Sequence, residues 1–141
     1  MARLWQCGFE LNSLTTGMEI SATSGTISIQ TSIARTGTYA LRTNAGTSFV
    51  RQHLAGSNQS SQVWVRAYLY IATLPGATTA VVRIANGSNA TCAQIGLTTG
   101  GTLVLNDATG AAVGSASAAL STATWYMVEL FLDASSSPGT V

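Results

Sequence analysis

Hydrophobic and polar residues alternate with a period of two along much of the chain, which is the pattern of half-buried β-strands. The clearest example is QVWVRAYLYI, residues 62–71. Successive side chains of an extended chain point to opposite faces, so this segment carries a different set of side chains on each face. One set is Val63, Val65, Ala67, Leu69 and Ile71, and the other is Trp64, Arg66, Tyr68 and Tyr70.

Similar alternating segments, separated by Gly, Asn, Ser and Pro, recur throughout the sequence and predict an all-β protein. Helix signals are nearly absent, because no window combines an amphipathic helical pattern with a capping residue. We expect strands over residues 7–11, 17–20, 26–30, 39–43, 48–54, 62–71, 80–85, 91–98, 101–106, 111–115 and 125–133.

Turn residues between these segments predict which strands are neighbours. Segments 17–20 and 26–30 are expected to pair, and 39–43 is expected to pair with 48–54 around NAG. NDATG, residues 106–110, is typical of a hairpin connection. No internal repeat of 20–50 residues is visible. We therefore expect one domain over residues 1–141, built as a two-sheet sandwich.

The order of four segments resembles the concanavalin A-like lectin/glucanase superfamily, which includes legume lectins, laminin-G-like domains, glucanases and some polysaccharide lyases. The segments are GFELNS, RTGTYALRTN, VWVRAYLYIATLPG and GTLVLNDATGAAVGSASAALSTATWYMVELFLD. The resemblance covers nearly the whole chain, and it is one of pattern and not of unique motifs. It implies an antiparallel jelly-roll sandwich.

The end of the chain departs from the pattern of this superfamily. There, a strand like WYMVELFLD is usually followed by a turn and one or two further strands, whereas here ASSSPGTV supplies the turn alone. We expect that the chain lacks its last strands or continues in a longer protein. The alternative is that a neighbouring molecule covers the exposed edge.

Charge is scarce: 8% of the 141 residues are charged, whereas about a quarter is usual in a soluble domain. The formal net charge of +1 offers nucleic acid no electrostatic attraction. No apolar run reaches the about 20 residues of a membrane helix. We therefore expect neither nucleic-acid binding nor membrane insertion. A surface rich in Ser, Thr, Asn and Gly suits close packing, which favours a subunit of a larger assembly.

The acidic residues do not form the carboxylate pair that glycoside hydrolysis needs, about 5–10 Å apart. Glu129 and Asp133 share a strand face but are four residues apart, roughly 13 Å at strand rise, with Phe131 between them. The lyase-like branch of the superfamily would use a Tyr, His or Lys side chain as the base. The chain contains residues of these types, but they do not form a recognisable motif. We expect no catalytic residues. The residues considered for these roles are Glu10, Glu19, Arg51, His53, Arg66, Tyr68, Tyr70, Asp107, Glu129 and Asp133.

Cofactor and metal sites are not expected either. Asn106 and Asp107 supply only two of the several oxygens that calcium needs. Cys7 and Cys92 are the only thiols and belong to no zinc-binding cluster. They are either two buried reduced cysteines or one disulfide.

The predicted strand 125–133 also alternates, and it carries Trp125, Met127 and Phe131 on one face. These side chains become neighbours of the aromatic set of 62–71 if the two strands share a sheet. We expect one surface to hold the candidate ligand- or partner-binding residues, and three interpretations of it stay open. It is a protein–protein interface, a concave glycan-binding face on which rings stack against sugars, or a part of the core between the sheets. The candidate residues are Trp64, Arg66, Tyr68, Tyr70, Arg83, Trp125, Met127 and Phe131.

Domains that resemble this one occur in phage capsid decoration and tail proteins. By that resemblance, we expect a non-catalytic structural module on the surface of a virus particle, made in the host cytoplasm without a signal peptide. Its partners would be other virion subunits or further copies of itself in a homo-oligomer. The first alternative is an extracellular carbohydrate-binding module or adhesin that binds a surface glycan, and the second is a fragment of a glycan-cleaving enzyme.

Overall fold

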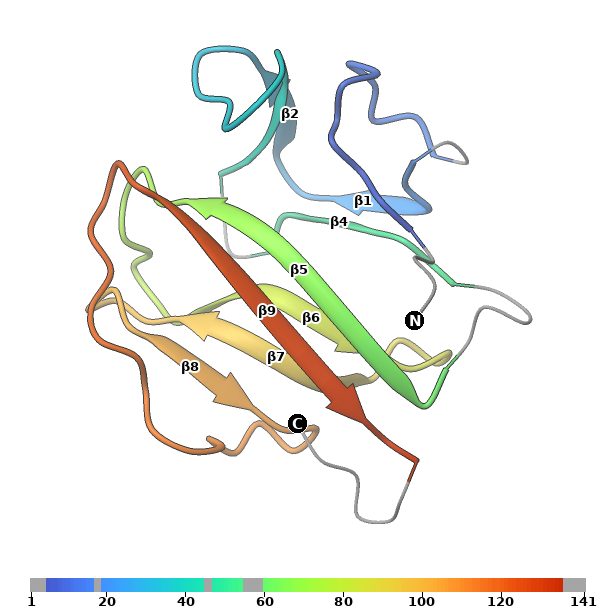
Figure 1. Cartoon of the computed structure of the whole chain (residues 1–141), viewed down its shortest axis with the longest axis vertical. Helices are drawn as coiled ribbons and strands as arrows, with labels where there is room; N and C mark the ends of the chain where they lie inside the picture. Colours follow the sequence, from blue (N-terminus) through green and yellow to red (C-terminus); the bar gives the residue numbers. More distant parts are fainter. Residues whose placement is uncertain (1–4, 17–18, 45–46, 55–59, 136–141) are drawn as a thin grey trace. The chain divides into compact units, whose positions relative to one another are not determined.

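The structure, a computed structural model, describes residues 5–16, 19–44, 47–54 and 60–135 (Figure 1). These residues form antiparallel strands and no helix. The chain divides into two compact units, Met1–Gln59 and Ser60–Val141, which are described separately. The strands are β1 Ala22–Ser24, β2 Ile27–Gln30, β3 Ala40–Thr43, β4 Phe49–Arg51, β5 Gln62–Tyr70, β6 Thr79–Ala85, β7 Thr91–Leu97, β8 Leu103–Asn106 and β9 Trp125–Asp133.

The N-terminal unit contains two nested strand pairs. β2 pairs with β3, and β1 pairs with β4 outside them in sequence. Gly25 joins β1 to β2 with a φ of 73°, and a Cβ at this position would lie 2.8 Å from the Cα of Ser48. The close approach of the backbones therefore requires glycine at this kink.

This nesting corrects the predicted pairing. Residues 27–30 pair with 40–43 and not with residues 19 and 20, the described part of 17–20, and 48–54 contributes a short strand that pairs with 22–24. Alternation identifies strands but not their partners, which is why the prediction failed. Gly17, Met18, Ala45 and Gly46 lie outside the described residues, and Ile20 forms only an isolated bridge with Thr16.

The predicted first strand, 7–11, is also wrong. Phe9 and Asn12 have positive φ angles of 62° and 50°, and the N–H of Asn12 donates to the carbonyl of Phe9, so the chain turns here. Between them, the carboxylate of Glu10 accepts hydrogen bonds from the N–H groups of Thr38 and Tyr39. This segment therefore anchors the turn that precedes β3.

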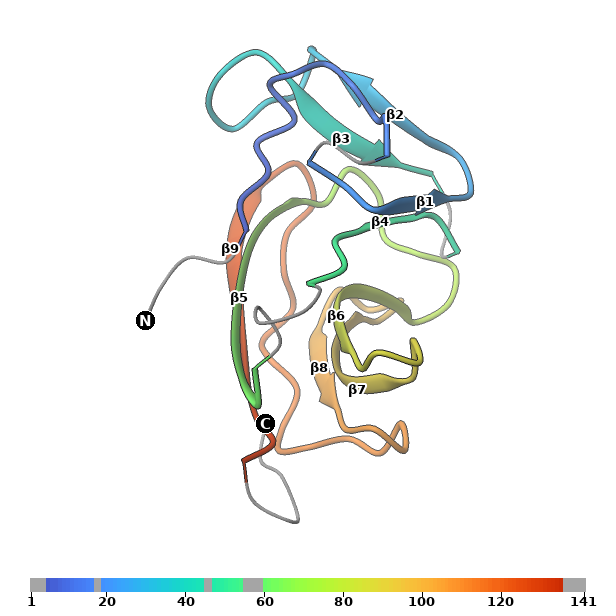
Figure 2. The ribbon, with the colours of Figure 1, turned by 90° about the vertical axis from the view of Figure 1, so that its right-hand side faces the viewer.

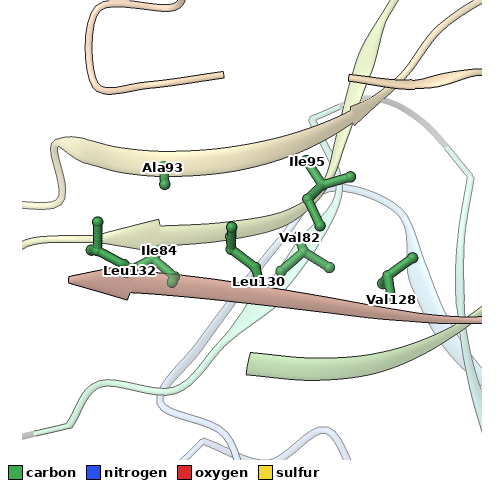
Figure 3. Close-up of a cluster of buried hydrophobic side chains, with 7 residues drawn as sticks. All are labelled: Val82, Ile84, Ala93, Ile95, Val128, Leu130 and Leu132. Atoms are coloured by element: carbon green, nitrogen blue, oxygen red, sulfur yellow. The ribbon is translucent and has the colours of Figure 1, made fainter. Parts of the chain in front are cut away.

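The C-terminal unit has two sheets that face each other, β5–β9 and β6–β7–β8 (Figure 2). Their inner faces meet in one hydrophobic core, and the apolar face of β5 packs against this core from its own sheet. The residues that contribute to this core from β5 and β9 are Val63, Val65, Ala67, Leu69, Val128, Leu130 and Leu132. The central core residues are Val82, Ile84, Ala93, Ile95, Val128, Leu130 and Leu132 (Figure 3).

The hairpin after β8 forms as a turn, but its returning strand does not. Asp107 accepts hydrogen bonds from the N–H groups of Thr109 and Ala111, which closes NDATG. Beyond it, Ala112 makes an isolated bridge with Asn106, and the segment follows β8 through single hydrogen bonds. The predicted strand 111–115 is interrupted where Gly114 takes a φ of 71°.

The all-β, antiparallel architecture is confirmed, and the C-terminal unit has the two facing layers of a β-sandwich. None of the sheets that the described residues form is closed. The jelly-roll topology, the single domain over residues 1–141 and the expected missing strands stay predictions.

Candidate functional site

The side of the β5–β9 sheet opposite the core carries most of the candidate residues. Directly opposed residues of an antiparallel pair lie on the same face, and the register of β5 against β9 pairs these side chains one to one. We call this surface the β5–β9 outer face. Its pairs are Gln62–Asp133, Trp64–Phe131, Arg66–Glu129, Tyr68–Met127 and Tyr70–Trp125.

An ion pair occupies the centre of the β5–β9 outer face. Nη2 of Arg66 lies 2.8 Å from Oε1 of Glu129, and Nε donates to the same oxygen at 2.9 Å. The hydrogen bond and charge of Glu129 raise the pKa of Arg66 above its ordinary value. The side chains are 61% and 38% exposed, and ion pairs this exposed add little stability. The pair therefore matters for the charge pattern that the face presents.

Aromatic pairs lie on both sides of this ion pair. The rings of Trp64 and Phe131 stack with centroids 4.6 Å apart and planes inclined by 30°. Tyr70 and Trp125 meet at 5.4 Å with planes inclined by 57°. Each ring therefore covers part of its cross-strand partner.

Much of this apolar surface is nevertheless exposed. Trp64 is 55% exposed, Met127 51% and Tyr68 40%, whereas Leu130 on the opposite face of β9 is 3% exposed. These three large side chains therefore lie outside the core between the sheets. The structure brings together seven of the eight predicted residues on one face: Trp64, Arg66, Tyr68, Tyr70, Trp125, Met127 and Phe131.

The eighth predicted residue, Arg83, lies elsewhere. It belongs to β6 in the other sheet, where Gln94 is its register partner. Its neighbours Val82 and Ile84 point into the core, so alternation directs Arg83 away from β9. Its Nη2 donates to Oδ1 of Asn89 at 3.0 Å. The structure does not bring Arg83 to the β5–β9 outer face.

The polar pair at one end of the face is held by local contacts. Nε2 of Gln62 donates to Oδ2 of Asp133 at 2.8 Å, and the N–H of Ser135 donates to Oδ1. Hydrogen bonds from Ser135, and then from Gln62, hold the pKa of Asp133 below its ordinary value. Asp133 and Glu129 are thus bound to different partners, with Phe131 between them on the same face. They do not form a converging carboxylate pair.

The residues considered for metal or thiol chemistry have structural contacts instead. Hydrogen bonds from Thr109 lower the pKa of Asp107 within its turn. Burial raises the pKa of the Cys7 thiol to about 11, and that thiol donates to Glu19 at 3.4 Å. Cys7 and Cys92 are both free thiols. Within the described part of the chain, no three His, Cys, Asp or Glu residues gather as a metal site would require.

The sequence did not reveal the cross-strand partners on the outer face. Alternation assigned Glu129 to the same side as Arg66, but only the register shows that they are directly opposed. The Gln62–Asp133 pair was missed for the same reason. Opposite charges or amides at matching positions of two predicted strands were the only available signal.

No helix among the described residues is long and apolar enough to cross a membrane. Comparisons of the chain with protein-family models, curated proteins and solved structures find no match. The resemblance to the concanavalin A-like superfamily therefore stays a prediction.

Proposed function

We propose that the chain is a non-catalytic interaction module that binds a protein partner through the β5–β9 outer face. The observation that carries this proposal is the exposure of Trp64, Tyr68 and Met127 on one ordered sheet face. Apolar surface exposed to water favours association, because association removes that surface from water. Trp, Tyr, Met and Arg are also the residue types enriched in protein interfaces.

Ring geometry favours a protein over a sugar as the ligand of this face. A glycan platform needs flat ring faces that are free to lie against the C–H bonds of a pyranose. Trp64 and Phe131 stack on each other, and Tyr70 and Trp125 are inclined by 57°, so neither pair forms a flat platform. A protein surface can instead fill the spaces between such rings with side chains of its own.

The low charge of the chain supports placing this partner in a large assembly. A neutral surface meets little long-range repulsion when many subunits pack closely. Together with the resemblance of the sequence to phage decoration and tail domains, this favours a virion component on the particle surface. The partner would then be another subunit of that particle.

The test is to follow the chain in virus particles purified by density gradient from cells that produce the chain. We expect the chain in the particle fraction, and we expect the Trp64→Ala/Tyr68→Ala variant to be lost from it. Phe49→Ala is the matched control, because Phe49 is also an exposed aromatic residue but lies on β4. Absence of the unaltered chain from particles would overturn the virion role.

Carbohydrate binding is the second candidate function, and the exposure of Trp64 is the observation that favours it. Affinity electrophoresis in gels that contain polysaccharides separates the two functions. Retardation of the unaltered chain that is abolished in Trp64→Ala and kept in Phe49→Ala would favour a glycan ligand. Unchanged mobility in every gel supports the protein partner.

A further inference from the structure

We infer that the partner of the β5–β9 outer face is a second copy of this chain, packed face to face about a two-fold axis parallel to the strands. This inference rests on the proposed function, because it names the occupant of the same surface. Charge complementarity of the face with itself supports the second copy, and this complementarity follows from the register of β5 against β9.

Symmetry determines which residues would meet. The axis lies above the outer face, midway between the two strands and parallel to them. A half-turn about this axis places β5 of the second copy over β9 of the first, and β9 of the second copy over β5 of the first. Each β5 residue then lies against the β9 residue that already opposes it within its own chain. A surface built of cross-strand pairs is therefore self-complementary if the two members of every pair attract each other.

The pairs of the outer face meet this condition. Arg66 of one copy would meet Glu129 of the other, and the reverse contact forms symmetrically, so four charges alternate in sign around the axis. Trp64–Phe131 and Tyr70–Trp125 would meet rings, and Tyr68 would meet a methionine. No like charges face each other among the five pairs of the outer face.

The central ion pair is the most robust part of this geometry. Packed sheets are usually rotated by about 30° relative to each other, which displaces the ends of the strands more than their middle. Arg66 and Glu129 are each the fifth residue of a nine-residue strand, so they stay close to the axis under such a rotation. They are the residues by which the inference is best tested.

The size of the face predicts a weak dimer. Nine residues at strand rise give a length of about 30 Å, and two strands with their side chains give a width of about 10 Å. A footprint of about 300 Å² on each copy is well below the about 800 Å² per partner of a standard specific interface, so it can support only a weak, transient contact. We therefore expect dimers that form with increasing protein concentration and dissociate on dilution.

Charge-reversal variants test the inference by analytical ultracentrifugation. Arg66→Glu places four acidic groups around the axis, and Glu129→Arg places four basic ones, so each variant alone should be monomeric. Mixed together, they should form a heterodimer in which both central contacts between the two chains join opposite charges. We expect the mixture to associate at least about tenfold more tightly than either variant alone, as is typical of close interfacial charge pairs.

A matched control excludes attraction through net charge. Arg83→Glu changes the net charge by the same amount as Arg66→Glu, but on the other sheet. Arg83→Glu keeps the unaltered outer face and should dimerise with itself, but in a mixed dimer with Glu129→Arg one of the two central contacts would join like charges. We therefore expect this mixture to gain less association than the mixture of Arg66→Glu with Glu129→Arg. The double variant Arg66→Glu/Glu129→Arg should dimerise like the unaltered chain, because the exchange preserves every opposite-charge contact.

The inference is overturned if the unaltered chain is monomeric at all accessible concentrations, or if the two single variants do not rescue each other. Failure here is distinguishable from failure of the proposed function. A monomeric chain that is bound in particles through Trp64 and Tyr68 would reject only self-association. A dimer that is absent from particles would reject only the virion role.

Discussion

Trp64 of β5 and Phe131 of β9 stack across the two strands, with ring centroids 4.6 Å apart. Cross-strand aromatic pairs of this geometry contribute about 0.5–1.5 kcal/mol beyond the area that they bury. We expect a double-mutant cycle of Trp64→Ala and Phe131→Ala, measured by urea unfolding, to give a coupling free energy in this range. A cycle of Phe49→Ala and Phe131→Ala should give a coupling near zero. Equal values in the two cycles would mean that the stacking adds nothing specific.

The two faces of β9 should differ sharply in their response to truncation. Leu130 is 3% exposed and belongs to the central core, so Leu130→Ala should lower the free energy of unfolding by about 2–5 kcal/mol. Met127 lies on the opposite face of the same strand and is 51% exposed. Met127→Ala should therefore change the free energy of unfolding by less than about 1 kcal/mol. Urea unfolding of both variants checks the assignment of core and outer face, and similar losses would contradict it.

The lowered pKa of Asp133 predicts that the free energy of unfolding depends on pH in the acidic range. Its hydrogen bonds with Ser135 and Gln62 hold its pKa below the ordinary value of 3.8. A carboxyl with a lowered pKa in the folded state contributes stability that is complete above the unfolded-state pKa and is lost as the pH falls through the folded-state pKa. The unaltered chain should therefore be more stable than Asp133→Asn at neutral pH, and this difference should shrink below pH 3.8. A difference that does not vary with pH would contradict the assignment.

The thiol of Cys7 should react slowly. Burial, together with the nearby carboxylate of Glu19, raises its pKa to about 11, compared with an ordinary value of 9.0. Because the thiolate is the reactive form, alkylation of Cys7 at neutral pH should be about a hundredfold slower in the folded than in the unfolded chain. Rates measured in a Cys92→Ser background check this. Glu19→Gln should accelerate the reaction, and an unchanged rate would exclude a role for Glu19.

The sequence predicted β5 and β9 best because both strands are long and strictly alternating. The expected segment 125–133 coincides with β9, and 62–71 exceeds β5 by one residue. Their common outer face could be predicted for the same reason, since alternation assigns a face to every side chain.

Predictions failed where the structure depends on contacts distant in sequence. Residues 7–11 resemble a strand, but the carboxylate of Glu10 binds the backbone of Thr38 and Tyr39, and the chain turns around it. β1 was missed because Ala22–Ser24 is short and mostly polar, and its partner β4 lies beyond an intervening strand pair. Arg83 was assigned to the outer face because alternation does not say to which sheet a strand belongs.

The nested pairing in the N-terminal unit has a consequence for the order in which that unit assembles. β1 and β4 lie on either side of β2 and β3 in the sequence, so the β2–β3 hairpin shortens the loop that the β1–β4 pair must close. A shorter loop costs less chain entropy. The β2–β3 hairpin should therefore form first, and the β1–β4 pair should form last. In native-state hydrogen exchange, the amides of β1 and β4 should open more readily than those of β2 and β3.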